Sequence, residues 1–292
     1  MKNTIFSGVC TALITPFCDD GCVDFVTLRN LIEEQIEQGV SALLVLGTTG
    51  ESPTLTESEK LKIIFFAKKV VDGRCKLIVG TGSNCTKTAI YSTQQAQIMG
   101  ADACLVITPY YNKCTQQGLI EHFSKIAKST RLPIIVYNVP SRTGVNISPE
   151  TLVELSKIEN IVGIKEANGD IGHVLSVFNA VKGRLAIYSG NDNLNHVFKS
   201  LGGNGTISVL SNAYCKQVVD GWKTMANSLK TQQRFFNLCN LLFVEPNPIP
   251  IKYVMSKMAK SKNVLRLPLT TLTKQNQTKL DAEMEKLKWI LL

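Results

Sequence analysis

Short, nearly continuous apolar runs recur eight times along the first 210 residues, and segments with helical spacing separate them. Successive runs begin about 20 to 35 residues apart, the length of a strand–helix–strand crossover unit. Parallel strands that are covered on both faces are apolar throughout rather than alternating. The runs therefore predict these buried strands: Val9–Ile14, Ala42–Leu46, Leu77–Gly80, Ala103–Thr108, Pro133–Asn138, Ile161–Lys165, Leu185–Ser189 and Gly205–Val209.

The segments between these runs have patterns that predict helices. Phe25–Gln38 is amphipathic and stops at Gly39, a residue that commonly ends helices. Thr56 precedes Glu59 by three residues at the head of another amphipathic stretch, which is a capping-box pattern. Strands that alternate with helices indicate an α/β fold with a parallel sheet, and eight such units favour closure into a (β/α)₈ barrel of the TIM type.

Beyond Leu210 the pattern is helical only, over Val218–Leu229, Arg234–Phe243, Ile251–Lys260 and a final helix from Thr273. We therefore predict a barrel domain over residues 1–215 and a C-terminal helical appendage over residues 216–292. The length of 292 residues accommodates both, because barrels of this type take about 250 residues.

The composition narrows the class of protein. Hydrophobic residues make up 44% of the chain and charged residues 19%, with a mean hydropathy of +0.07. These values exclude disorder as the main state, and no apolar run approaches the roughly 18 residues of a transmembrane helix. The nine cysteines are scattered without a CxxC pair, which is typical of free thiols and predicts a cytoplasmic location.

The formal charge is +9, and residues 252–292 hold nine Lys/Arg against three Asp/Glu, a surplus of +6. Such an excess can attract nucleic acid. The lysines are interspersed with Leu, Met and Thr, so a solvated helical face is the favoured interpretation. A non-catalytic basic barrel that binds nucleic acid is kept as the alternative from another class, and it would show steeply salt-dependent binding.

Candidate chemistry is sought at the carboxyl ends of the strands, where barrels of this type place their active sites. Lys165 ends the apolar run that starts at Ile161, so its side chain should enter the barrel mouth. Burial disfavours the charged form of an amine, and a Schiff-base nucleophile must be uncharged. The alternative is a structural ion pair with Glu166, and position alone does not decide between the two.

Other strand ends offer supporting groups. Tyr137 ends the neighbouring strand and could relay protons beside Lys165, or it is an ordinary buried tyrosine. The segment 47–50, Gly-Thr-Thr-Gly, could hold a carboxylate with its backbone N–H groups, or it is a plain tight turn. Arg142, on the loop that follows the strand of Tyr137, could bind a second carboxylate, or it is a surface arginine. The three histidines are isolated, and a catalytic metal is not expected.

Three motifs together resemble the dihydrodipicolinate synthase family, within the N-acetylneuraminate lyase superfamily of Schiff-base aldolases. They are Gly47-Thr48-Thr49-Gly50-Glu51-Ser52, Tyr137-Asn138-Val139-Pro140-Ser141-Arg142-Thr143-Gly144 and Gly163-Ile164-Lys165-Glu166-Ala167. The resemblance covers about Phe6 to Leu267 and keeps the order and spacing of the motifs.

The resemblance implies a lyase of lysine and diaminopimelate biosynthesis that joins pyruvate to aspartate semialdehyde. It implies that Lys165 forms an imine with pyruvate and that Tyr137, Thr48 and Tyr111 relay protons, with Tyr111 reaching into a neighbouring subunit's site. Thr48 and Thr49 would hold the pyruvate carboxylate, Arg142 the carboxylate of the semialdehyde, and Gly190 and Ile207 would line the pyruvate pocket. A homotetramer, no cofactor and no nucleic acid or membrane partner are implied likewise.

The chief rival is another pyruvate-dependent aldolase of the superfamily, either an N-acetylneuraminate lyase or a 2-keto-3-deoxy sugar acid aldolase. These share the lysine and the tyrosine, and Arg142 within Pro-Ser-Arg-Thr-Gly favours the synthase. Lysine-sensitive relatives bind lysine in an interface cleft near the positions of Asn84 and Tyr110. There Thr88 stands where they have a glutamate, and Lys60 and Glu57 stand where they have histidines, so we predict weak or absent inhibition by lysine.

Overall fold

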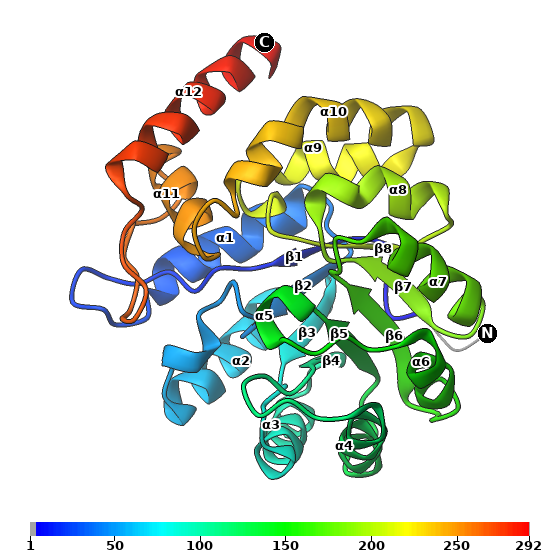
Figure 1. Ribbon diagram of the computed structural model, residues 1–292. Helices are drawn as coiled ribbons and strands as arrows, with labels where there is room; N and C mark the ends of the chain where they lie inside the picture. The colour runs from blue at the N-terminus through cyan, green and yellow to red at the C-terminus, as the bar shows by residue number, and fades with distance from the viewer. Residues whose placement is uncertain (1–3, 292) are drawn as a thin grey trace.

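The computed structural model describes residues 4–291 and contains a closed barrel of eight parallel strands, each hydrogen-bonded to its neighbours in chain order. Figure 1 shows the strands at the centre of the molecule and helices around them. The strands are β1 (Gly8–Ala12), β2 (Ala42–Val45), β3 (Lys76–Gly80), β4 (Ala103–Ile107), β5 (Ile134–Asn138), β6 (Ile161–Glu166), β7 (Ala186–Ser189) and β8 (Gly205–Ser208). The predicted barrel is confirmed, with each strand end within two residues of its expected position.

Helices connect the strands and cover the outside of the barrel. They are α1 (Phe25–Glu37), α2 (Glu57–Val71), α3 (Thr86–Ile98), α4 (Gln116–Lys128), α5 (Pro140–Thr143), α6 (Pro149–Leu155), α7 (Ile171–Val181) and α8 (Asn195–Ser200), with short 3₁₀ turns η1 (Ser52–Thr54) and η2 (Asp192–Leu194). The predicted capping box is present at the start of α2, because Thr56 Oγ1 accepts from Glu59 N at 3.3 Å and Glu59 Oε2 accepts from Thr56 N at 2.8 Å.

After the barrel the chain forms α9 (Ser211–Lys223), α10 (Met225–Leu241), α11 (Ile249–Lys257) and α12 (Lys274–Leu291). Both predicted segments, Val218–Leu229 and Arg234–Phe243, are largely helical, but their bounds are wrong because the break falls at Thr224. This residue has an extended backbone, and its side chain caps α10 by accepting a hydrogen bond from Asn227 N. The division proposed at residue 215 falls within α9, and the domain division itself stays a prediction.

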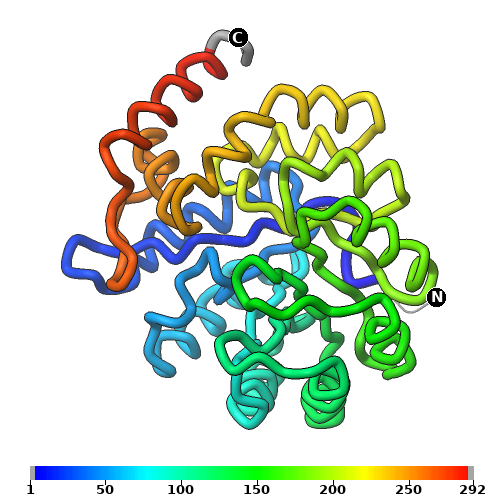
Figure 2. The backbone as a smooth tube through the Cα atoms, in the orientation of Figure 1, coloured from blue at the N-terminus to red at the C-terminus, as the bar shows by residue number. Residues whose placement is uncertain are grey.

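The segment between α11 and α12 contacts the loop that follows β1. Figure 2 shows the segment after α11 beside the loop that follows β1. Arg266 donates from Nε and Nη2 to the carbonyl of Gly21 at 3.0 and 2.8 Å, and Lys262 pairs with Asp19. No helix among residues 4–291 is long and apolar enough to cross a membrane.

Alternate strand residues face the barrel interior or the surrounding helices. Ile135 and Tyr137 of β5 belong to the apolar cluster inside the barrel, whereas Val136 belongs to the cluster between strands and helices. Ile164 of β6 also belongs to the outer cluster. The next residue, Lys165, therefore directs its side chain into the barrel, and this alternation decides the chemistry of the site.

Candidate active site

A cavity of about 390 Å³ opens at the carboxyl ends of the strands. Six of the predicted site residues line it, and they come from strand ends and loops far apart in the sequence. They are Thr48, Thr49, Tyr137, Arg142, Lys165 and Gly190.

Lys165 lies at the wall of this cavity and is only 5% exposed. Its Nζ lies 4.3 Å from the centroid of the Tyr137 ring, and the two residues are paired in register across β5 and β6. Glu166 faces the other side of the strand, where Asn138 and Asn168 donate to its carboxylate. The alternative Lys165–Glu166 ion pair is therefore absent, and no carboxylate pairs with Lys165 within residues 4–291.

Gly190 allows the Lys165 stem to lie close to β7. A Cβ at this position would come within 3.1 Å of Lys165 Cε and 2.7 Å of the Ala167 Cβ. These separations are shorter than ordinary contact, so a larger residue would fit only if Ala167 and the Lys165 stem moved. The Gly190 N–H also donates to the carbonyl of Glu166 at 2.8 Å, which ties the two strand ends together.

The loop after β2 presents Thr48 and Thr49 to the cavity. Gly50 N and Glu51 N donate back to the carbonyls of Gly47 and Thr48, so these two N–H groups are used within the turn. The N–H groups of Thr48 and Thr49 have no hydrogen-bond partner in the described part of the chain. They remain available, with the two hydroxyls, to bind a carboxylate.

A buried ion pair fixes Glu51 at the end of the loop that follows β2. Glu51 has a left-handed backbone, with φ of 52°, and its carboxylate pairs with Lys252 while accepting from Arg266 N at 3.1 Å. Lys252 is fully buried, its Nζ lies 4.1 Å from the centroid of the Phe17 ring, and burial lowers its pKa to about 8. This pair was not predicted from the sequence because its members are about 200 residues apart.

Asn247 contacts both Thr49 and Arg142, which are predicted to bind carboxylates. Its Nδ2 donates to Thr49 Oγ1 at 2.9 Å, and its carbonyl accepts from Arg142 Nη2 at 3.2 Å. The side-chain Oδ1 of Asn247 is buried and has no hydrogen-bond partner. Asn247 also lines the cavity. Asn247 was not among the predicted site residues; its only local signal is the Pro246-Asn247-Pro248 turn that precedes α11.

Tyr111 and Ile207 lie elsewhere. Tyr111 is 92% exposed, has a φ of 70° and does not line the cavity of its own chain. Ile207 is fully buried on β8 opposite Cys10, inside the barrel, and is not a lining residue either. No hydrogen bond among residues 4–291 joins the hydroxyls of Thr48, Tyr137 and Tyr111, so the proton relay stays a prediction.

Cys10 is unsuited to act as the nucleophile of this site. Cys10 lies inside the barrel, where burial raises the pKa of its thiol far above the ordinary value and keeps it protonated. Among the described residues, no three His, Cys, Asp or Glu side chains are grouped so that they could hold a metal ion. A nearly buried amine beside a phenol, with two carboxylate-binding regions in reach, is an arrangement that can carry imine chemistry.

Comparisons with known proteins show the family of this chain. The dihydrodipicolinate synthetase family model matches residues 5–287. A 4-hydroxy-tetrahydrodipicolinate synthase from Alkaliphilus oremlandii is 47% identical over 97% of this chain and 99% of its own length.

Solved structures give the same result. A dihydrodipicolinate synthase from Acinetobacter baumannii, complexed with pyruvate, superposes with a TM-score of 0.94 at 40% identity, over 98% of this chain and 99% of that one. The enzyme from Cyanidioschyzon merolae, with lysine bound, gives 0.93 at 36% identity over the same shares. The chain belongs to the dihydrodipicolinate synthetase family.

Proposed function

We propose that this protein is a lyase that condenses pyruvate with L-aspartate 4-semialdehyde to give 4-hydroxy-tetrahydrodipicolinate, an early step of diaminopimelate and lysine biosynthesis. Family membership over nearly the whole chain supports this activity. The observation that carries the mechanism is the placement of Lys165, with its Nζ against the Tyr137 ring at the cavity wall and no carboxylate to pair with it in the described chain.

The amine of Lys165 attacks the carbonyl carbon of pyruvate, and the oxygen leaves as water once it has been protonated. The resulting iminium acidifies the adjacent methyl group, which loses a proton to give an enamine. The enamine carbon then attacks the aldehyde, and the aldehyde oxygen takes up a proton. The amino group of the semialdehyde finally attacks the iminium carbon, which closes the ring and releases the amine of Lys165. Covalent attachment thus replaces one difficult carbanion-forming step with easier ones, and it needs neither a metal nor an organic cofactor.

Each remaining residue has a role in this proposal. Tyr137 exchanges the protons together with Thr48 and Tyr111, while Thr48 and Thr49 hold the carboxylate of pyruvate. Arg142 binds the carboxylate of the semialdehyde at the mouth. Gly190 and Ile207 shape the pyruvate pocket.

A homotetramer, built as a dimer of dimers, completes the proposal. Tyr111 supports it, because a large aromatic ring that is 92% exposed on a backbone with φ of 70° is uncommon in an isolated chain. In the assembly Tyr111 would enter the site of the neighbouring subunit. The free thiols of all nine cysteines fit the cytoplasm, and no nucleic-acid or membrane partner is required.

A mixing experiment tests the shared site. Tyr111→Phe and Lys165→Ala are each expected to be nearly inactive, yet their mixture regains activity after subunit exchange. In a hybrid dimer the Tyr111→Phe subunit keeps its own Lys165 and receives an intact Tyr111 from its partner. A mixture that stays inactive despite proven exchange, or a monomer at working concentration in sedimentation, would contradict the assembly.

The choice of second substrate tests the activity. We expect pyruvate consumption with aspartate semialdehyde and none with N-acetylmannosamine or with the aldehydes that give 2-keto-3-deoxy sugar acids. The family comparisons do not favour these rival aldolases. Turnover with N-acetylmannosamine in preference to the semialdehyde would replace the proposal with the rival.

A further inference from the structure

Two polar residues lie directly behind Lys165 and Tyr137, on the opposite face of the same strands. Asn138 follows Tyr137 on β5, Glu166 follows Lys165 on β6, and Asn138 and Glu166 are paired in register like their predecessors. Both are fully buried on the side of the strands that faces the helices. Asn138 Nδ2 donates to both carboxylate oxygens of Glu166 at 3.0 Å, so a side-chain contact links the two strand ends directly behind Lys165.

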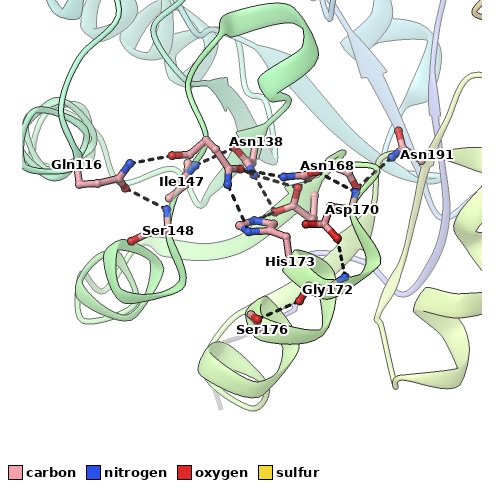
Figure 3. A network of polar contacts seen from close by, with 12 residues as sticks. Gln116, Asn138, Ile147, Ser148, Asn168, Asp170, Gly172, His173, Ser176 and Asn191 are labelled. Carbon is pink, nitrogen blue, oxygen red and sulfur yellow. Dashed lines mark hydrogen bonds and ion pairs between the residues drawn. The ribbon is translucent and has the colours of Figure 1, made fainter.

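Glu166 has further partners that fix it. Asn168 N donates to Oε1 at 2.7 Å, and His173 Nε2, from α7, lies 3.4 Å from Oε2. The hydrogen bond to this carboxylate raises the pKa of His173. Figure 3 shows Asn138, Asn168 and His173 gathered in one network outside the barrel wall. Since a buried carboxylate is costly unless it is well hydrogen-bonded, these contacts hold the end of β6 in one place.

Asn138 also holds the loop that carries Arg142. Its Oδ1 accepts from Ile147 N at 3.1 Å, and its Nδ2 donates to Asn146 Oδ1 at 2.8 Å. The segment that leaves β5 after Asn138 and carries Arg142 therefore returns to Asn138 eight residues later. Gln116 of α4 fastens the same end by donating to Asn146 O at 2.8 Å and accepting from Ser148 N at 3.0 Å (Figure 3).

We propose that Glu166 and Asn138 are positioning residues that set Lys165 against Tyr137 and anchor the return of the Arg142 loop. This inference rests on the proposed function, because it assigns a purpose to the imine-forming lysine. Neither residue lines the cavity, so both act through the strands. A misplacement of about 1 Å can cost on the order of 100-fold in rate, and the close approach of Gly190 to Lys165 leaves little room for a shift.

Reductive trapping of the imine separates positioning from binding. The rate of borohydride-dependent adduct formation is measured against pyruvate concentration for wild type, Glu166→Gln and Asp170→Asn. In Glu166→Gln an NH₂ group faces the donors of Asn138 and Asn168. We expect its trapping rate at saturating pyruvate to fall about tenfold or more, while the half-saturating pyruvate concentration stays within about twofold, because the Thr48–Thr49 loop is outside the network.

Asp170→Asn is the matched control. Asp170 belongs to the same network, but its Oδ1 only caps α7 by accepting from Gly172 N at 2.8 Å, which an asparagine can also do. It should trap pyruvate at the wild-type rate. Glu166→Asp keeps the charge and withdraws the carboxylate by one methylene, so its rate should fall between the two; this variant decides the question if Glu166→Gln does not fold.

A reversal variant tests the contact itself. In Asn138→Asp combined with Glu166→Gln, the glutamine can donate to the new carboxylate, so the saturating trapping rate should recover above that of either single variant. Rates of folded Glu166→Gln and Glu166→Asp equal to that of Asp170→Asn would overturn the inference. A wild-type protein that forms no adduct would instead overturn the proposed function.

Discussion

The Nζ of Lys165 lies 4.3 Å from the centroid of the Tyr137 ring, because the two residues occupy paired positions on adjacent strands and face the same interior. The ring covers the amine, and the hydroxyl of Tyr137 remains without a hydrogen-bond partner in the described chain. This relationship predicts that the phenol exchanges protons with groups formed at Lys165. Removal of the hydroxyl should therefore affect the chemistry more than the fold.

Tyr137→Phe keeps the ring beside Lys165 and removes the proton donor. We expect kcat to fall about 10²- to 10⁴-fold, the usual range for a lost general acid–base group. Tyr188→Phe is the control, since Tyr188 is paired with Lys165 on the other side but donates its hydroxyl to the carbonyl of Phe6 at 3.0 Å. Steady-state turnover compares the two, and equal losses would remove Tyr137 from the relay.

Arg142→Ala should impair use of the semialdehyde and leave imine formation with pyruvate nearly unchanged. A hydrogen bond to a charged group contributes about 1.5–3 kcal/mol, which is roughly 10- to 150-fold in kcat/KM for the second substrate. The measurement pairs kcat/KM for aspartate semialdehyde with the rate of pyruvate trapping. A comparable loss in both would show that Arg142 does not serve the second substrate alone.

Inhibition by lysine should be weak or absent. Glu57, Lys60, Thr88 and Tyr110 line an extension of the same cavity, whereas Asn84 is not a lining residue. Thr88 offers no carboxylate to a ligand's ammonium group, and Lys60 adds an ammonium group near a cationic ligand. We expect half-inhibition above about 1 mM lysine, a Kd equivalent to roughly −4.1 kcal/mol.

Restoring the two side chains tests the reason for that insensitivity. Thr88→Glu with Lys60→His should lower the half-inhibitory concentration in the same turnover assay. Strong inhibition of the wild type below about 1 mM would show that Thr88 and Lys60 do not disable the cleft.

The stability of the fold should depend on pH through His122. This residue of α4 is 5% exposed, its Nδ1 lies 2.9 Å from Thr86 Oγ1, and burial lowers its pKa to about 4. The unfolded chain takes up a proton near pH 6.5, so the free energy of unfolding falls as pH drops from about 6.5 towards 4.

His122→Gln should remove this dependence. Between pH 7.5 and 5 the wild type should lose on the order of 2 kcal/mol more of its unfolding free energy than the variant. Urea unfolding at one fixed protein concentration measures both, since assembly makes stability depend on concentration. Parallel pH profiles for the two proteins would contradict the assignment to His122.

The sequence predicted the barrel and the position of Lys165 because both follow from local patterns. Continuous apolar runs mark buried parallel strands, and a lysine that ends such a run on the interior phase must reach the mouth. The break at Thr224 was missed because apolar residues continue on both sides of it, and a single capping threonine decides the boundary. Asn247 and the Glu51–Lys252 pair were missed for another reason: their contacts span about 200 residues and arise only when the C-terminal helices fold back on the barrel.

Peptide mapping after borohydride reduction shows whether Lys165 is the amine that binds pyruvate covalently. The protein is incubated with pyruvate and borohydride, digested, and the modified peptide is sequenced by mass spectrometry. We predict irreversible inactivation with one reduced pyruvyl adduct per chain, located on Lys165, and no adduct in Lys165→Arg, whose guanidinium is not deprotonated in proteins. An adduct on another lysine, or full activity without any adduct, would contradict the mechanism.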